Sequence, residues 1–161
     1  MSRAPRGFTI VELVVTLVIA GILAAVAMPR FFARQPFESR GYLDESRAAI
    51  AYAHKLAIAS GCDVHVRFDA GGYALGRWPA CRPADHSAAV TTITRSTGDP
   101  FASAPPDGVA VGTLAFYFDR VGRPRRADLG AAIITNAAEL RVAVAGTTLQ
   151  VEPETGAVRS L

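Results

Sequence analysis

The sequence predicts an α+β fold, in which a long N-terminal helix precedes a small head built on an antiparallel β-sheet. Two observations predict it. The first is an apolar run over residues 8–28, which polar residues and glycine interrupt at only four positions. The second is a series of short alternating segments after residue 62, separated by turn residues, which is typical of antiparallel strands.

Length and composition limit the classes of protein to which the chain can belong. It has 161 residues, a formal net charge of +3 and two cysteines. This length fits one ordinary domain, or a smaller domain joined to a membrane segment. A charge this close to zero does not require a nucleic-acid partner. The apolar share of 50% is concentrated in the first thirty residues, and the remainder is long enough for a modest core.

The apolar run is long enough to cross a bilayer as a helix. At 1.5 Å per residue, residues 8–28 span about 31 Å, which matches the hydrocarbon core. A secretory signal peptide is the alternative, but the only small-residue cleavage site, at residues 25–27, is weak. Basic residues flank the run in nearly equal number on both sides, so they give little indication of orientation.

Glu12 is a carboxylate inside this run. An ionisable group in hydrocarbon is costly, so it indicates a functional site by default. The alternative is that the side chain reaches the nearby interface. A carboxylate in lipid needs a cationic partner or it becomes neutral.

The segment "RGFTIVEL" resembles the N-terminal signal of type IV pilins and pseudopilins. It has a short basic leader, a glycine, a phenylalanine, and a glutamate five residues after the glycine. The resemblance implies that prepilin peptidase cuts between Gly7 and Phe8, and that Phe8 is then N-methylated. It also implies an assembly role for Glu12, which would pair with the Phe8 amine of a neighbouring subunit.

Residues 8–28 would then form the transmembrane and filament-core helix, after a leader over residues 1–7. Pro29 matches the proline found late in this span in the family. It removes one helix hydrogen bond, so we expect a kink near Ala25. Residues 29–61 are expected to continue the helix, with its second half packed on the head.

The second half of this helix has an apolar stripe at helical spacing, and Gly61 is placed to end it. The residues of the stripe are Ala49, Tyr52, Ala53, Leu56 and Ala57.

Residues 62–161 are expected to form a β-rich periplasmic head. The segments "CDVHVRF" and "YALGRW" flank the turn "DAGG" and predict a hairpin. Further strands are predicted in "TLAFYFDRVGRP", in "ELRVAVAG" and on both sides of the turn "PETG". Residues 79–108 are rich in turn residues, which indicates a long surface connection with one short strand, "AVTTITR".

The two cysteines, Cys62 and Cys81, lie at the two ends of the predicted hairpin. After an export-type N-terminus, two cysteines favour one disulfide in an oxidising compartment. Two reduced thiols are the alternative. A bridge would pin the end of the helix to the loop that follows the hairpin.

The layout of helix and sheet resembles the H-type minor pseudopilins of type II secretion and the related FimT-type minor pilins. The turn "DRVGRP" and the closing hairpin "VEPETG" carry this resemblance. "PRFF", "RGYLDE", "YAHKLAIASGCDV", "GYAL" and the second cysteine resemble more closely the minor pilins of mannose-sensitive haemagglutinin pili. Residues 82–108 match no part of these families.

The resemblance implies a minor pilin that contributes to the assembly or priming of a type IV pilus, with a secretion pseudopilin as the alternative. Such a chain is a single-pass protein of the bacterial inner membrane, with its head in the periplasm, before it enters a pilus or pseudopilus. Its partners would be other pilins of the filament, prepilin peptidase and inner-membrane lipid.

The sequence shows no catalytic constellation, no cofactor motif and no metal-ligand spacing. His54, His65 and His86 are not spaced as ligands, and each is expected on the surface. We therefore predict a structural subunit without a cofactor or a metal, and not an enzyme.

The segment "DRVGRPRR" holds the one arginine cluster that suggests a ligand. Arg120, Arg123, Arg125 and Arg126 lie beside glycine and proline, where exposed guanidinium groups can bind phosphates. Some FimT-type pilins bind DNA through a Gly-Arg-x-Arg motif in a C-terminal tail, whereas here these letters lie in a mid-domain turn. A DNA-binding pilin of natural transformation is therefore the alternative from another class. A solvated turn or a salt bridge between subunits is the simpler interpretation.

Overall fold

The computed structural model describes residues 9–161 except for residues 32–34, 82–85, 87 and 127–131, with residues 26–31 and 35–36 described by their backbone alone. The chain divides into two units, Met1–Phe37 and Glu38–Leu161. The predicted helix is present as two helices, α1 over Ile10–Phe31 and α2 over Gln35–Ser60.

The first helix, α1, begins directly after Thr9. The Thr9 hydroxyl accepts a hydrogen bond from the backbone N–H of Glu12 at 3.2 Å, which satisfies one of the donors that a helix start leaves open. The Thr9–Glu12 spacing is that of a capping box. Pro29 lies inside α1, which continues to Phe31, and the kink expected near this proline stays a prediction.

The second helix, α2, begins at Gln35, within the range in which a helix was expected. Pro36 lies in its first turn, where a missing N–H removes no helical bond. The helix ends as predicted at Gly61, whose positive φ of 65° suits glycine. The Gly61 N–H still donates to the Ala57 carbonyl at 3.0 Å, so the helix closes on a glycine C-cap.

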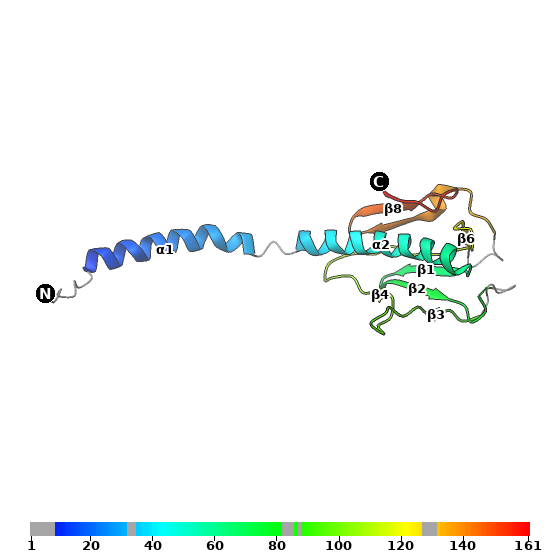
Figure 1. Ribbon diagram of the computed structural model, residues 1–161. Helices are drawn as coiled ribbons and strands as arrows, with labels where there is room; N and C mark the ends of the chain where they lie inside the picture. The colour runs from blue at the N-terminus through cyan, green and yellow to red at the C-terminus, as the bar shows by residue number, and fades with distance from the viewer. Residues whose placement is uncertain (1–8, 32–34, 82–85, 87, 127–131) are drawn as a thin grey trace. The chain divides into compact units, whose positions relative to one another are not determined.

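The head contains two antiparallel sheets (Figure 1). The larger, which we call the main sheet, has the order β3-β2-β1-β5-β6, with β4 also paired to β2. Its strands are β1 (Val64–Asp69), β2 (Gly72–Arg77), β3 (Thr91–Thr92), β4 (Ala102–Ser103), β5 (Leu114–Phe118) and β6 (Pro124–Arg126). The predicted hairpin is β1–β2, with Val64 opposite Arg77.

The smaller sheet has the order β7-β8-β9 and follows a short 3-10 helix, η1 (Ala137–Leu140). Its strands are β7 (Arg141–Val144), β8 (Thr147–Val151) and β9 (Val158–Ser160). The predicted "PETG" turn joins β8 to β9, and within it the Gly156 N–H donates to the Glu152 carbonyl at 2.8 Å.

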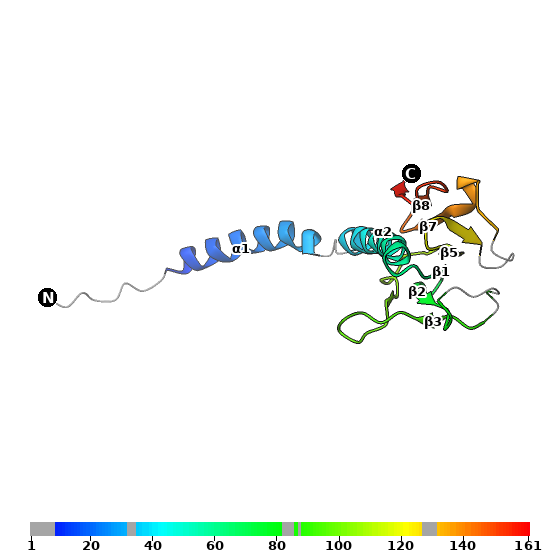
Figure 2. The ribbon, with the colours of Figure 1, turned by 45° about the vertical axis from the view of Figure 1, so that its right-hand side comes forward.

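Helix α2 packs against both sheets. In Figure 2, β7 and β8 lie on one side of α2, and β1, β2 and β3 lie on the other. One apolar cluster joins the buried face of α2 to both sheets, which confirms the α+β class. Ala49, Ala53 and Ala57 are almost fully buried on this face, because small side chains let the helix approach the strands closely.

The buried face of α2 differs from the predicted stripe. Tyr52 was expected inside but is 42% exposed, whereas Tyr42, Ser46 and Ile50 are buried. The segment between β3 and β4 accounts for Tyr52, since the Phe101 ring stacks on it with ring centroids 4.6 Å apart. The described part of residues 79–108 holds two short strands, β3 and β4, where the sequence indicated one.

Candidate functional site

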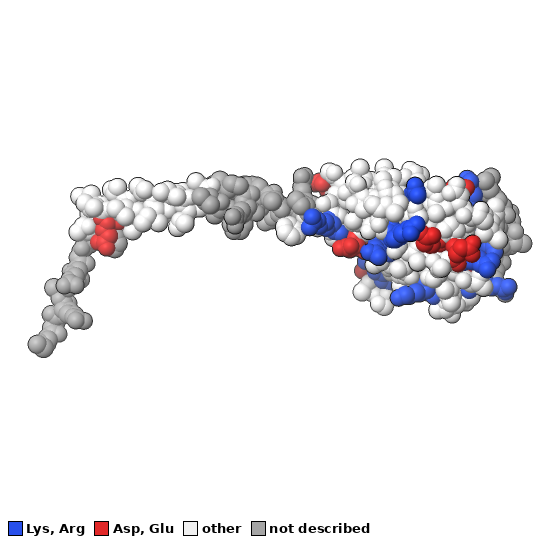
Figure 3. Space-filling view, turned by 90° about the horizontal axis from the view of Figure 1, so that it is seen from above, with Lys and Arg blue, Asp and Glu red and all other residues white. Residues whose placement is uncertain are grey.

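The surface of α1 is apolar on every side. Its large apolar side chains from Ile10 to Leu23 are all at least half exposed, with values from 50% to 83%. In Figure 3 the part of this helix that is not drawn in grey is uncharged except for one acidic position near its start, which is Glu12. A helix that is hydrophobic all round is normally buried in protein or lipid, so we expect this surface to be covered by one of the two.

We expected residues 8–28 to cross a membrane. Among the residues that the structure describes, no helix combines the length and the apolar character that crossing a bilayer requires.

Glu12 lies in the first turn of α1 and is exposed. Its backbone is held by Thr9, and its carboxylate makes no ion pair with any described residue. The negative charge complements the positive end of the helix dipole. The Thr9-x-x-Glu12 spacing could have revealed this cap in the sequence. The predicted cleavage residues, Gly7 and Phe8, lie outside the described residues.

The predicted disulfide is present. Cys62 and Cys81 are bonded, with their Cα atoms 4.6 Å apart, so the end of α2 is tied to the loop after β2. Directly beside the bridge, the Asp63 N–H donates to the Cys81 carbonyl at 2.9 Å.

The "DRVGRP" segment is a turn organised by the Asp119 carboxylate. This carboxylate accepts hydrogen bonds from the backbone N–H groups of Val121 and Arg123, at 3.0 Å and 2.9 Å. It also pairs with Nε of Arg125 at 2.6 Å. Gly122 has a φ of +81°, which favours glycine. The motif that carried the family resemblance is therefore a structural element of the head.

The arginine cluster is partly used inside the head. Besides the pair of Arg125 with Asp119, Arg126 pairs with Glu139 at 3.2 Å. Arg120 and Arg123 are exposed. Two of the four guanidinium groups therefore pair with acids of the head, and the other two are exposed. DNA binding stays a prediction.

His54 was expected on the surface, but two turns cover it. A Cβ atom at Gly122 or at Gly156 would come within 2.5 Å of the His54 ring, and the Phe118 ring meets it edge-on at 5.1 Å. Burial, and then the charge of Lys55, lower the pKa of His54. The turns "DRVGRP" and "PETG" therefore meet over the end of α2, and this contact needs glycine on both sides.

His65 and His86 were also expected on the surface. Both instead pack against aromatic rings on the face of the main sheet that is turned away from α2, which we call the outer face. Together with Trp78 and Tyr117 they form what we call the aromatic cluster. The His86 ring stacks on Tyr117 at 4.3 Å, and Trp78 meets the other three rings edge-on at 4.5–5.5 Å. Burial is the main cause that lowers the pKa of His65 to about 4, so this imidazole is neutral at pH 7.

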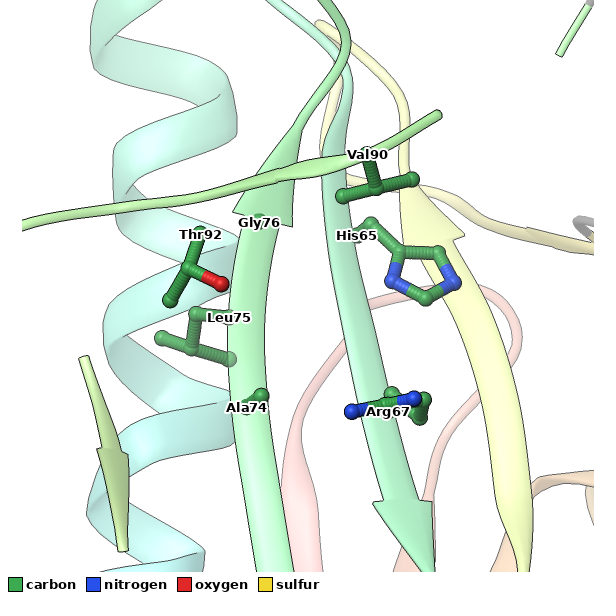
Figure 4. A pocket seen from close by; sticks show the side chains of 7 residues that line it. All are labelled: His65, Arg67, Ala74, Leu75, Gly76, Val90 and Thr92. Atoms are coloured by element: carbon green, nitrogen blue, oxygen red, sulfur yellow. The ribbon is translucent and has the colours of Figure 1, made fainter. Parts of the chain in front are cut away.

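A pocket of about 300 Å³ lies next to this cluster, on the same face of the sheet (Figure 4). His65 and Arg67 line it from β1, and Thr92 lines it from the β3 side. A Cβ atom at Gly76 would clash with the Val90 side chain, so Val90 lies directly over Gly76. Among the lining residues, Thr92 carries a hydroxyl and none is an acid. Among the described residues, no group of three His, Cys, Asp or Glu side chains is placed to hold a metal ion.

The similarities of this chain to known proteins cover only a part of it. Residues 2–28 match the family model "Prokaryotic N-terminal methylation motif". The chain is also 38% identical over 52 residues to the type IV narrow pilus major component PilA5 of Thermus thermophilus, which covers 32% of this chain and 45% of that protein. The chain thus aligns with less than half the length of this curated relative. No solved structure matches the chain.

These similarities agree with the geometry of α1, an apolar helix with one acid in its first turn. The methylation motif ends within α1. The chain is therefore type IV pilin-like, with a prepilin-type N-terminal methylation motif followed by an α+β head.

Proposed function

We propose that the chain is a minor pilin of a type IV pilus, of the mannose-sensitive haemagglutinin type, that contributes to assembly or priming. It is a structural subunit and not an enzyme. The observation that carries this proposal is Glu12, a lone carboxylate in the first turn of a helix that is otherwise apolar on every side.

The proposed chemistry is charge compensation between subunits. Removal of residues 1–7 by prepilin peptidase leaves an amine on Phe8, which is then methylated and stays cationic. In apolar surroundings the Glu12 carboxylate needs such a cation, since a buried charge without a partner is costly. Because the Thr9 cap uses only the backbone of Glu12, the carboxylate remains available to a neighbouring subunit.

The apolar surface of α1 has two covers in this proposal. Before assembly, inner-membrane lipid covers it, and the head lies in the periplasm. After assembly, the equivalent helices of other pilins replace the lipid in the filament core. The disulfide supports this location, because disulfides persist in oxidising compartments.

The second candidate is an H-type minor pseudopilin of type II secretion. The "DRVGRP" turn carries the resemblance to the H-type pseudopilins, and its Asp119 carboxylate organises the fold of the head. This turn supports the pseudopilin as much as it supports the pilin. Deletion of the gene distinguishes the two: loss of surface pili with intact protein secretion supports the pilus, and the reverse result supports secretion.

Gly7 provides a direct test of processing. Replacing Gly7 by a bulky residue such as leucine should leave residues 1–7 attached, because a small residue is expected to be required at the cut. Intact-mass measurement of the protein from membranes of its host would show the leader retained. Arg3→Ala, which changes the leader without touching the cut, is the control and should still be processed. Normal processing of the Gly7 variant would contradict the proposed cleavage site.

A further inference from the structure

Another pocket, which we call the α2–β3 pocket, lies between the C-terminal half of α2 and the adjoining part of the main sheet. Its volume is about 430 Å³, and pockets that bind small organic molecules usually measure about 300–1,000 Å³. Tyr52, Leu56 and Ser60 line it from α2. These three residues are four positions apart, so they lie on one face of the helix and form one wall of the pocket.

The opposite wall of the α2–β3 pocket consists of residues from three neighbouring strands. Val64 of β1 is paired with Arg77 of β2, and Arg77 is paired with Thr91 of β3. Paired residues of adjacent strands point to the same face of a sheet, and Val64 packs in the core on this face. All three residues line the pocket, so the Arg77 guanidinium and the Thr91 hydroxyl lie side by side on one wall.

Main-chain hydrogen bonds and a ring stack fix both walls. The Ile93 N–H, in a residue that also lines the pocket, donates to the Leu75 carbonyl at 2.9 Å, and the Ile93 carbonyl accepts from the Phe101 N–H at 2.6 Å. The Phe101 ring stacks on Tyr52 with ring centroids 4.6 Å apart, yet Tyr52 is 42% exposed. A wall that is already ordered loses little conformational freedom when a ligand binds.

Arg77 supplies the only charge among the described residues that line the α2–β3 pocket. It is exposed and forms no ion pair with any described residue, whereas Arg67 of the neighbouring strand pairs with Asp69 at 3.4 Å. A guanidinium without a carboxylate partner can bind an added carboxylate through two parallel hydrogen bonds. One cation matches the single charge of a carboxylate better than the double charge of a phosphate.

The remaining lining determines how such a ligand would be oriented. Leu56 and Ile93 are partly buried apolar residues at the edge of the core. The carbonyl end of α2, which closes at Ser60, carries a partial negative charge, so an anionic group is disfavoured there. The carboxylate is therefore favoured beside Arg77 and Thr91, and an apolar group is favoured against Leu56 and Ile93.

From this arrangement we propose that the α2–β3 pocket binds a small organic molecule in which one carboxylate is attached to an apolar group. The Arg77 guanidinium pairs with the carboxylate, and Tyr52 and Leu56 contact the apolar group. The alternative is that Arg77 only complements the negative end of the α2 dipole, in which case no such molecule binds. This inference stands independently of the proposed pilin function, because none of these residues belongs to α1.

The test titrates the ¹⁵N-labelled full chain, in mild detergent, with 4-phenylbutyrate. We expect saturable shifts of the amide NMR signals that are confined to the residues of the pocket, with Thr91 and Ile93 among them. Two matched molecules separate the contributions, since 4-phenylbutan-1-ol has no charge and acetate has no apolar group. Each should bind at least about tenfold more weakly than 4-phenylbutyrate.

Two variants show whether Arg77 holds the carboxylate. Arg77→Gln should weaken the binding of 4-phenylbutyrate by about tenfold or more and leave the circular dichroism unchanged, because this side chain is exposed. Arg67→Gln, which removes an arginine that does not line this pocket, is the control and should change the affinity by less than about twofold. Absence of saturable binding, equal binding of 4-phenylbutan-1-ol, or an unchanged affinity of the Arg77→Gln protein would overturn the proposal.

Discussion

Replacement of Glu12 by alanine is expected to reduce incorporation into filaments by about tenfold or more, while the protein still reaches the membrane. The carboxylate is the only charge on the described part of α1 before Pro29, so alanine makes this helix more apolar and does not oppose its insertion. In the proposed pairing, however, the Phe8 amine of the neighbouring subunit loses its counter-charge. A buried cation left without its partner costs about 3–5 kcal/mol. The measurement is the amount of the chain in sheared filaments relative to the amount in membranes.

Thr16→Val is the matched control for this experiment. Thr16 lies one turn further along α1, and its hydroxyl donates only to the Leu13 carbonyl of the same helix, at 2.8 Å. Its loss removes a polar group without removing a charge, so filament incorporation should be unchanged. Normal incorporation of the Glu12→Ala protein would remove the assembly role of this residue.

Replacement of Asp119 by alanine should destabilise the head by about 2–4 kcal/mol, because it removes a buried carboxylate that organises a turn. Two backbone N–H groups and the Arg125 guanidinium lose their acceptor together. The same turn covers His54 at the end of α2, so its loosening affects the contact with the "PETG" turn as well. Urea unfolding of the full chain in detergent, followed by circular dichroism, measures the free energy.

The control for Asp119 is Asp107, an exposed acid of the loop before β5. Asp107→Ala removes the same charge from a position where the side chain organises no turn, and should change the free energy of unfolding by less than about 0.5 kcal/mol. If the two variants were equally stable, Asp119 would not be the residue that holds the "DRVGRP" segment.

Local patterns predicted the elements whose signals lie close together in the sequence. Alternation and the turn "DAGG" indicated the β1–β2 hairpin, and Gly61 indicated the end of α2. The disulfide followed from the cysteine count and the export-type N-terminus. These features depend on few residues at short range, so a single sequence is sufficient to find them.

Contacts over long sequence distances could not be predicted in this way. His65 alternates with core residues of β1, which indicated an exposed side chain, but the ring of Trp78, which directly follows β2, packs edge-on against it. The burial of His54 depends on two glycines that are 34 residues apart in the chain, Gly122 and Gly156. The strands β3 and β4 have two residues each, which is too short for an alternating pattern.

The ion pairs of the arginine cluster could not be predicted for a related reason. Four arginines within seven residues suggested a phosphate site. The acids with which these arginines form ion pairs, however, are determined by the fold. Asp119 takes Arg125 from within the same turn, and Glu139 takes Arg126 from η1. A charge cluster in a sequence therefore indicates a ligand only after the acids that approach it in the fold are known.

The most direct test of the central claim is the intact mass of the protein recovered from filaments sheared off its native host. We predict a chain that begins at Phe8, carries one added methyl group and retains one disulfide. A chain with residues 1–7 still attached, a chain cut beyond the apolar helix, or absence of the protein from the filaments would contradict the account.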